Sequence, residues 1–434
     1  MKGSSPCLRE QHPVTSRRPV EPPSGQALIL PGERHGRGLR IGIFWSYLCG
    51  GGVETVNRDI AESLSRDKYE VDAIVWQAEN LFISMARAFD RLVVLNQPFE
   101  DFTPQERVGP FTPIAQCADF QRLLEDRQYD LMIMSCAWAP FWLAHMHGIP
   151  VVEYWHGYGC WNGWRMPADA IVAVSQTTRK QVETLRPQHA PVTVIRNAID
   201  SARYADSALK RGEARRRFGL PLEDPVLLYC GRFSAEKRPQ DAMAAFVKAK
   251  EAQPNLKLLM VGTCMAPEYF DRIGTAIGLH WGEDAFRFCL DHDEVDLAYA
   301  AADVMLHPSD WEGLGMVLLE AMAVGVPIVS TFAGGCREAL EGVGVEVPLG
   351  NPEAMAKAVL DLLRDRRRTA KLVDAGRRRV AKHFDLRTNA GKLERVIQSV
   401  LKPRPRKLSP EEYRAQEITA RRFASKVPYH NPEG

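Results

Sequence analysis

The chain alternates short, nearly uninterrupted apolar runs with longer segments in which apolar residues recur every three to four positions. The first pattern is typical of strands buried on both faces of a parallel sheet, and the second of helices that cover such a sheet. The apolar run Leu39–Ser46, for example, is followed at helical spacing by Val53, Val56, Ile60 and Leu64. The pattern therefore predicts an α/β protein with parallel sheets.

This alternation occurs twice, once in each half of the chain. In the first half, strands are predicted at Leu39–Ser46, Tyr69–Trp76, Leu92–Leu95, Leu131–Ala137, Pro150–Trp155 and Ala170–Ser175. In the second half, strands are predicted at Val226–Gly231, Leu256–Gly262, Phe286–Leu290, Val304–His307 and Pro327–Thr331. Helices are predicted at Val53–Arg66, Arg238–Ala252, Pro267–Leu279, Glu294–Ala302, Asn351–Arg364, Arg368–His383 and Lys392–Leu401. Two doubly wound, Rossmann-like domains facing each other across a cleft are expected.

The length of 434 residues also favours two domains, because a single core rarely grows beyond about 250–300 residues. We expect an N-terminal domain over residues 39–205, a charged linker over 206–224 and a C-terminal domain over 225–384. A helix at about 385–401 is expected to pack back on the N-terminal domain. The remaining ends, 1–38 and 402–434, are predicted to be basic tails, the first of them disordered.

Composition narrows the class of protein. Apolar residues make up 45% and charged residues 25%, as in ordinary globular proteins, and no apolar run approaches the length of a membrane span. The N-terminal segment has no apolar stretch typical of a secretory signal. The nine cysteines include no Cys-x-x-Cys pair, which argues against a zinc knuckle or a thioredoxin-like site. A reduced, cytoplasmic protein is expected.

The formal charge of +2 is unevenly distributed, since residues 1–40 and 401–434 each carry four more basic than acidic residues. We favour solvated ends as the explanation. The alternative is peripheral contact of the basic tails with the anionic inner face of the membrane, or with another polyanion. No nucleic-acid partner is expected, because no basic patch is interleaved with aromatic residues.

The segment from Pro308 to Ala323 carries the most chemistry. It places Glu312 and Glu320 around a short Gly-x-Gly loop and the first turns of a helix, directly after a predicted strand. Ligands of such βαβ units sit at the carboxyl ends of the strands, where carboxylates accept hydrogen bonds from hydroxyls and a helix N-terminus attracts anions. A ligand with both hydroxyl and phosphate groups fits this segment.

A second segment, Gly231–Pro239, follows the first strand of the C-terminal half. Arg232 and Lys237 lie on this loop, where a guanidinium binds two phosphate oxygens and an ammonium acts as a mobile charge. The alternative is a surface loop in which a basic residue pairs with Glu236. The basic loop and the acidic segment together in one α/β domain favour a phosphate-bearing ligand.

These segments resemble the motifs of the retaining family 4 glycosyltransferases (glycosyl transferases group 1), which have the GT-B fold. Gly231–Pro239 resembles the family's diphosphate-binding segment, Glu312–Glu320 its Glu-x7-Glu motif, Ile328–Glu338 the strand and glycine loop that follow, and Ala170–Ser175 with Val194–Asp200 the end of its first domain. The resemblance covers roughly residues 39–395 and implies transfer of a sugar from a nucleotide diphosphate sugar, with retention at the anomeric carbon.

The resemblance also implies roles for individual residues. Arg232 and Lys237 would hold the diphosphate, Glu320 would bind the ribose, and Glu312 would lie near the donor sugar. The backbone N–H groups of the Gly313–Gly315 turn, at Leu314 and Gly315, would reach the sugar hydroxyls. Leu314 departs from the aromatic or small residue usual in the family, so the sugar pocket is expected to differ. Cys336 and Arg337 also depart from the apolar or proline residues usual before Glu338.

In the N-terminal half, the resemblance implies two further contributions. Gly51 and Gly52 would let the backbone approach the phosphate or the acceptor, since glycine has no Cβ to clash. His156 matches a histidine that lines the donor sugar and is predicted to be catalytic together with Arg232, Lys237 and Glu312. The alternative is a histidine with a purely structural role at the end of a strand.

No metal or other cofactor is expected. Asp291-His292-Asp293 has the form of a metal-binding Asp-x-Asp, but Asp293 is well placed as a helix N-cap, and basic side chains replace the metal in the family that the chain resembles.

Two other functions stay open, a related nucleotide-sugar epimerase and a non-catalytic nucleotide-sugar-binding protein. The base, the sugar, the acceptor and the oligomeric state are not indicated, and the segment Gln77–Gln121 matches no motif.

Overall fold

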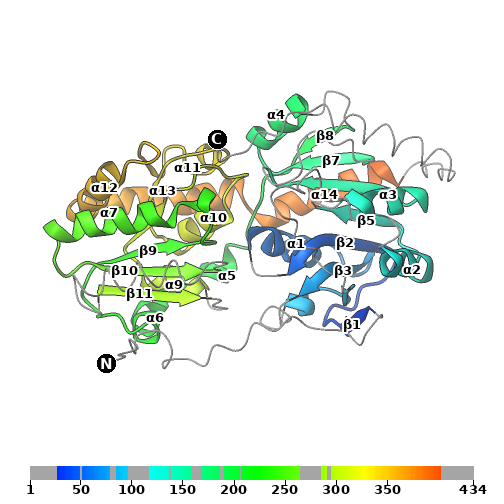
Figure 1. Cartoon of the computed structure of the whole chain (residues 1–434), viewed down its shortest axis with the longest axis horizontal. Helices are drawn as coiled ribbons and strands as arrows, with labels where there is room; N and C mark the ends of the chain where they lie inside the picture. The colour runs from blue at the N-terminus through cyan, green and yellow to red at the C-terminus, as the bar shows by residue number, and fades with distance from the viewer. Residues whose placement is uncertain are drawn as a thin grey trace, which may run out of the picture. The chain divides into compact units, whose positions relative to one another are not determined.

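The computed structural model describes residues 27–48, 51–78, 85–95, 117–135, 138–157, 168–185, 190–205, 207–263, 285–290 and 295–401. The chain folds into two compact units. The described residues of the N-terminal unit fall within Pro19–Cys49, Val53–Arg196 and Arg387–Gly434, and the C-terminal unit consists mainly of Asn197–Leu386. Each unit contains its own sheet (Figure 1), and the predicted α/β class is confirmed.

Within its described residues, the N-terminal unit has one eight-stranded sheet in the order β1-β4-β3-β2-β5-β6-β7-β8. The strands are β1 (Leu28–Pro31), β2 (Leu39–Leu48), β3 (Tyr69–Ala78), β4 (Arg91–Val94), β5 (Leu131–Met134), β6 (Val151–Trp155), β7 (Ala170–Ala173) and β8 (Val192–Val194). All neighbours pair in parallel except β1 and β4, which are antiparallel. The winding reverses between β2 and β5, so the sheet is doubly wound.

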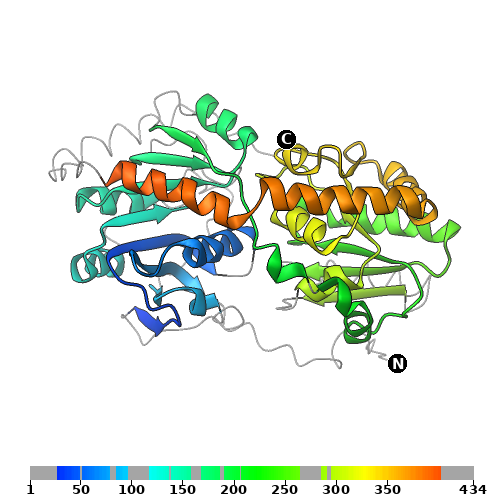
Figure 2. The same ribbon diagram turned by 180° about the vertical axis from the view of Figure 1, so that it is seen from behind.

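Helices cover this sheet. They are α1 (Gly52–Ser63), α2 (Ala118–Arg127), α3 (Trp138–Met146), α4 (Gln176–Leu185) and α14 (Leu386–Val400). On one face, Phe44 of β2 makes edge-on ring contacts with Trp76 of β3 and Phe120 of α2, with ring centroids 5.1 and 5.4 Å apart. Helix α14, orange-red in Figure 2, belongs to this unit, and its Gln398 and Glu394 contact Tyr69 and Lys68.

The C-terminal unit has a sheet of six described strands in the order β11-β10-β9-β12-β13-β14, all parallel. The strands are β9 (Val226–Cys230), β10 (Lys257–Gly262), β11 (Phe286–Leu290), β12 (Val304–His307), β13 (Ile328–Ser330) and β14 (Val345–Glu346). The helices are α5 (Ala202–Ala205), α6 (Arg211–Arg217), α7 (Pro239–Ala252), α9 (Val295–Ala301), α10 (Met316–Val324), α11 (Cys336–Leu340), α12 (Pro352–Arg364) and α13 (Arg366–His383). Helices α7 and α12 pack on one face through an apolar core.

The N-terminal tail is shorter than expected. Residues 27–38 are part of the fold, because β1 pairs with β4 and Arg34 bonds to Asp90 at 2.7 Å. The parallel arrangement that the sequence predicts therefore has one antiparallel edge strand. The strand was missed because its residues alternate between half-buried and exposed, and it ends in a proline.

The charged segment 206–224 is not a linker. It contains the 3-10 helix η4 (Ser207–Lys210) and α6, and it belongs to the C-terminal unit. Arg215 is fully buried, where its guanidinium bonds to the Asp303 carboxylate at 2.7 Å and to the carbonyls of Ala301 and Pro221. Charge alone could not show that this arginine is internal. The predicted helix Pro267–Leu279 lies outside the described residues.

Candidate active site

The two motif loops meet where the winding of the C-terminal sheet reverses. Strand β9 lies between β10 and β12, so the chain moves to one side of β9 first and later returns to the other. Ligands of doubly wound sheets bind at this reversal, beyond the carboxyl ends of the strands. The loop after β9 carries Arg232 and Lys237, and the loop after β12 carries Glu312.

Close backbone contacts fix the loop after β9. A Cβ atom at Gly262 would lie 1.8 Å from the carbonyl oxygen of Gly231, so only glycine fits there. The 3-10 turn η5 (Ala235–Lys237) ends at Arg238, a residue with the left-handed φ of 47°, and Pro239 then begins α7. The Arg238 guanidinium bonds to Asp310 at 3.3 Å, which ties this loop to the acidic one.

The glycine pair after β13 supports the acidic loop. Gly335 donates its N–H to the Glu312 carbonyl at 2.8 Å, and a Cβ atom at Gly335 would lie 1.9 Å from the carbonyl oxygen of Gly313. Gly334 has a φ of 59° and would bring a Cβ within 2.3 Å of the Glu312 carbonyl oxygen. The glycine pair in the motif is therefore explained by the close approach of two backbones.

Lys237 and Glu312 form an ion pair, with 2.8 Å between Nζ and Oε1 and side-chain exposures of 16% and 14%. Burial by itself raises the pKa of Glu312. The Lys237 charge and the hydrogen bond from His307 outweigh burial and lower the pKa to about 2. The carboxylate is therefore ionised at neutral pH, beside a cation that is mostly buried.

Two further side chains, His307 and Ser309, contact Glu312, and a third, Ser330, contacts His307; none of them was predicted from the sequence. His307 Nε2 lies 3.2 Å and Ser309 Oγ 3.1 Å from Glu312 Oε1. On its other side, His307 Nδ1 lies 3.2 Å from Ser330 Oγ at the end of β13. In the sequence, His307 is marked only as the polar residue that ends the apolar run of β12. The sequence does not indicate that its partner is Ser330, which lies on another strand.

Glu320, predicted to bind a ribose, is buried on α10. Its Oε2 accepts a 2.7 Å hydrogen bond from the hydroxyl of Tyr299 on α9, and Cys230 Sγ lies 3.5 Å from the same hydroxyl oxygen. Burial raises the pKa of Tyr299 well above its usual value, so the hydroxyl keeps its proton and donates. The same effect raises the pKa of the Cys230 thiol to about 12, which makes it unreactive. No sequence pattern pointed to Tyr299.

Arg232 does not join the buried pair. Its side chain is 55% exposed and bonds to Glu236 Oε1 at 3.1 Å, which is the surface pairing considered as the alternative for this loop. Of the turn itself, Leu314 is buried, so its side chain packs in the core. Gly315 adopts a φ of 85° and caps α10, and Gly313 lies against Gly335.

Of the predicted residues of the N-terminal half, His156 lies at a strand end, and Gly51 and Gly52 lie at the start of a helix. His156 follows β6, where its Nε2 lies 3.2 Å from Ser135 Oγ after β5. Burial lowers the pKa of His156 to about 4, so the ring is neutral at pH 7. Gly51 forms the bend before α1, which begins at Gly52. Asp291 and Asp293 lie outside the described residues.

Two family profiles match the chain. The one described as Glycosyltransferase Family 4 covers residues 50–203, and the one described as Glycosyl transferases group 1 covers residues 210–379. Across the part of the chain that the structure describes, no helix is both long and apolar enough to cross a membrane.

Individual relatives share about a quarter to a third of their residues with the chain. N-acetyl-alpha-D-glucosaminyl L-malate synthase of Bacillus anthracis is 28% identical, over 54% of this chain and 61% of its own. A GDP-mannose-dependent alpha-(1-6)-phosphatidylinositol monomannoside mannosyltransferase of Mycolicibacterium smegmatis is 30% identical, over 53% of this chain and 62% of its own. The matched regions span less than two thirds of these relatives.

Among solved structures, HepE of Anabaena in complex with UDP and glucose has a TM-score of 0.68 at 20% identity, with 83% of this chain and 100% of that chain covered. This likeness and the two doubly wound units show that the chain has the GT-B fold. Since the two profiles together span both units, the chain belongs to glycosyltransferase family 4, as its motifs indicated.

Proposed function

We propose that the protein is a retaining, metal-independent glycosyltransferase that moves a sugar from a UDP- or GDP-sugar to a saccharide, lipid-linked or natural-product acceptor. The observation that carries the proposal is the pairing of Lys237 with Glu312 at the point where the sheet reverses its winding. Lys237, which we assign to the diphosphate, and Glu312, which we assign to the sugar, lie 2.8 Å apart there, so one ligand that joins a diphosphate to a sugar can reach both.

The relatives support a nucleotide-sugar donor without selecting the base. HepE of Anabaena is in complex with UDP and glucose, and the mycobacterial mannosyltransferase is GDP-mannose-dependent. Both bases therefore belong in any test of this protein.

In the proposed reaction, the bond between the sugar's anomeric carbon and the diphosphate oxygen breaks, and a bond to an acceptor hydroxyl forms on the same face. The acceptor's proton passes to the departing phosphate oxygen. Negative charge grows on the diphosphate, where Lys237 and Arg232 stabilise it, and positive charge grows on the sugar ring, near Glu312. For this, Arg232 has to leave Glu236. Glu320 binds the ribose, and the roles expected of His156, Gly51 and Gly52 remain predictions.

The test is a thermal-shift screen of UDP, GDP, ADP and their sugars, followed by transfer assays with the donors that bind. A true ligand at a hundred times its dissociation constant should stabilise the protein by about 2.7 kcal/mol. Transfer to an added acceptor is expected, with the product's anomeric configuration equal to the donor's. Release of an altered sugar without acceptor would instead establish an epimerase, and binding without any turnover a non-catalytic protein.

A further inference from the structure

The Glu312 carboxylate uses its two oxygens unequally. Oε1 is within hydrogen-bond distance of Lys237 Nζ at 2.8 Å, Ser309 Oγ at 3.1 Å and His307 Nε2 at 3.2 Å. No side chain or backbone group of the described residues bonds to Oε2. One oxygen is thus held by the protein, and the other is available to a ligand.

Ser330 orients the ring of His307. Ser330 Oγ accepts the Phe332 N–H at 3.2 Å, and its hydroxyl lies 3.2 Å from His307 Nδ1. Held in this way, the ring directs Nε2 at Glu312 Oε1, 3.2 Å away, where an N–H on Nε2 can donate to the carboxylate. Both residues are buried, which keeps water from competing for these bonds.

Lys237 has two tasks that conflict under the proposed function. In the structure its ammonium neutralises Glu312, but it also has to bind the donor's diphosphate. When Lys237 turns toward the phosphates, Glu312 becomes a buried carboxylate with a weakened counter-charge, which costs stability or leads to protonation. Another group has to keep the carboxylate ionised and in place.

We propose that His307 is a positioning residue for the transfer reaction. Its Nε2–H, oriented by Ser330, holds Glu312 Oε1 while Lys237 moves to the diphosphate, so that Oε2 stays directed at the donor sugar. The Ser309 hydroxyl contributes a second hydrogen bond to the same oxygen, and the Ser309 backbone is fixed by a 2.7 Å hydrogen bond from Thr331. This inference rests on the proposed function.

The experiment compares His307→Ala and His307→Gln in the full-length protein, with His383→Ala, an exposed histidine of the same unit, as the control. Calorimetry measures the affinity for the bare nucleotide diphosphate and for the intact nucleotide sugar. In His307→Ala, the nucleotide should bind within about twofold of wild type, while the nucleotide sugar weakens and turnover falls, each by about tenfold or more. The side-chain amide of glutamine places an N–H at a similar distance, so His307→Gln should keep most of the nucleotide-sugar affinity and most of the turnover.

A pH profile gives a second readout that a purely structural residue would not move. Among the described residues, the charged or titratable groups that interact with Glu312 are Lys237, His307, Cys336 and Tyr229. Without the hydrogen bond from His307, burial of Glu312 is less opposed and its pKa rises, so the acid limb of kcat should move to higher pH in His307→Ala. If this variant does not fold, Ser330→Ala is expected to give the same changes at smaller size.

Equal weakening of nucleotide and nucleotide sugar, or failure of Gln to restore turnover in a folded protein, would overturn the positioning role. Failure of the proposed function looks different, because then wild-type protein would bind neither ligand or would show no transfer.

Discussion

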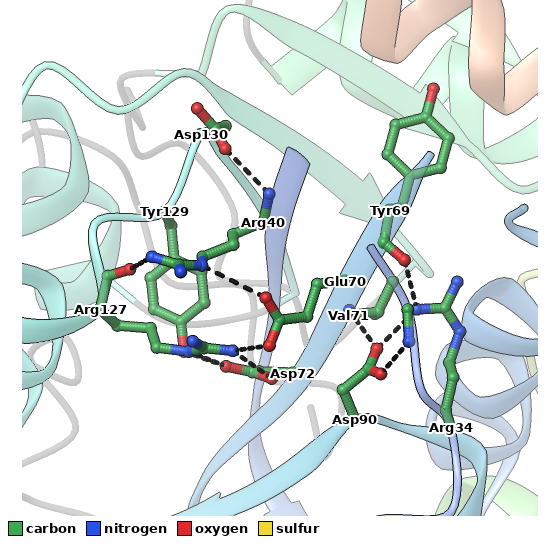
Figure 3. A network of polar contacts seen from close by, with 11 residues as sticks. Arg34, Arg40, Tyr69, Glu70, Val71, Asp72, Asp90, Arg127, Tyr129 and Asp130 are labelled. Atoms are coloured by element: carbon green, nitrogen blue, oxygen red, sulfur yellow. Dashed lines mark hydrogen bonds and ion pairs between the residues drawn. The ribbon is translucent and has the colours of Figure 1, made fainter. Parts of the chain in front are cut away.

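The protein buries carboxylates beside cations at opposite ends of its strands, and the two places differ in how the carboxylates are used. In the N-terminal unit, Asp72 lies in the amino-terminal half of β3 and Asp90 directly before β4, within the network of Figure 3. In the C-terminal unit, Glu312 lies beyond the carboxyl end of β12. All three carboxylates are paired with a basic side chain.

Both oxygens of each aspartate are occupied by the protein. Asp90 accepts from Arg34 and the Val71 N–H through Oδ2, and from the Gly36 N–H through Oδ1. Asp72 accepts from Arg127 through both oxygens, and from the Tyr129 hydroxyl at 2.9 Å. No oxygen is left for a ligand, so this network holds the strands and the loops before them together.

Glu312 has the opposite character, since its hydrogen bonds within the described residues all end on Oε1. A buried ion pair alone therefore does not distinguish a structural site from a functional one. Two observations together do so here: the position at the carboxyl ends of the strands, and an oxygen to which none of the described residues bonds.

The largest effect on stability is expected from Asp90→Ala. Removing the carboxylate leaves Arg34, which is 1% exposed, without its counter-charge, and such a loss typically costs about 3–5 kcal/mol. Urea unfolding followed by tryptophan fluorescence should report this, because Trp45, Trp76 and Trp155 lie in the N-terminal unit. Turnover per folded molecule should be unchanged.

The control for Asp90→Ala is Glu183→Ala in the same unit. Glu183 pairs with Arg179 on the surface of α4, with exposures of 41% and 44%, and its loss should change stability by less than about 0.5 kcal/mol. Equal effects of the two substitutions would show that the buried network does not hold the N-terminal unit together.

Lys237→Ala is expected to have the largest effect on activity. Loss of the cation that stabilises the departing diphosphate should reduce turnover at least about a hundredfold, measured as kcat at saturating donor. Lys371→Ala, on the exposed face of α13, is the matched control and should keep wild-type turnover. A Lys237 variant with near-normal rates would show that Lys237 does not bind the diphosphate. The Lys237–Glu312 pair would then no longer differ in function from the pairs of Asp72 and Asp90.

The sequence predicted most of the fold because its signals are local. Strands buried on both faces appear as apolar runs, so β2, β9 and β12 could be recognised without any partner. β1 and α6 could not, since each depends on a pairing across the chain: β1 on β4, and Arg215 of α6 on Asp303. The spacing of apolar residues along the chain does not indicate such long-range contacts.

The site residues also fall into those that a local motif indicates and those that only a contact across the chain reveals. Lys237 and Glu312 could be selected individually, since each stands in a motif at a strand end, but their 2.8 Å contact required the structure. His307 and Tyr299 have no motif of their own and gain their roles only from Glu312 and Glu320. Arg232 is the opposite case. It stands in a clear motif, but its side chain pairs with Glu236 on the surface and not with the buried residues of the site.

A smaller effect is expected from Tyr299→Phe, compared with Tyr129→Phe. Each substitution removes one buried hydroxyl that donates to a carboxylate, at 2.7 Å to Glu320 and at 2.9 Å to Asp72. Tyr299→Phe should weaken UDP or GDP binding by about three- to tenfold in calorimetry, because the carboxylate proposed to bind the ribose loses its orientation. Tyr129→Phe should lower the stability of the protein and leave its nucleotide affinity unchanged. If both variants lost the same nucleotide affinity, Glu320 would not be the residue that binds the ribose.

The smallest effect is expected from removing metal ions. The proposed reaction stabilises the departing diphosphate with Lys237 and Arg232, so it assigns no role to a divalent ion. Turnover after dialysis against EDTA should therefore stay within about twofold of the untreated protein, and added Mg²⁺ or Mn²⁺ should not raise it. A complete loss that metal restores would return Asp291 and Asp293 to consideration as metal ligands. It would also mean that the ion pair of Lys237 and Glu312 is a structural contact like those of Asp72 and Asp90.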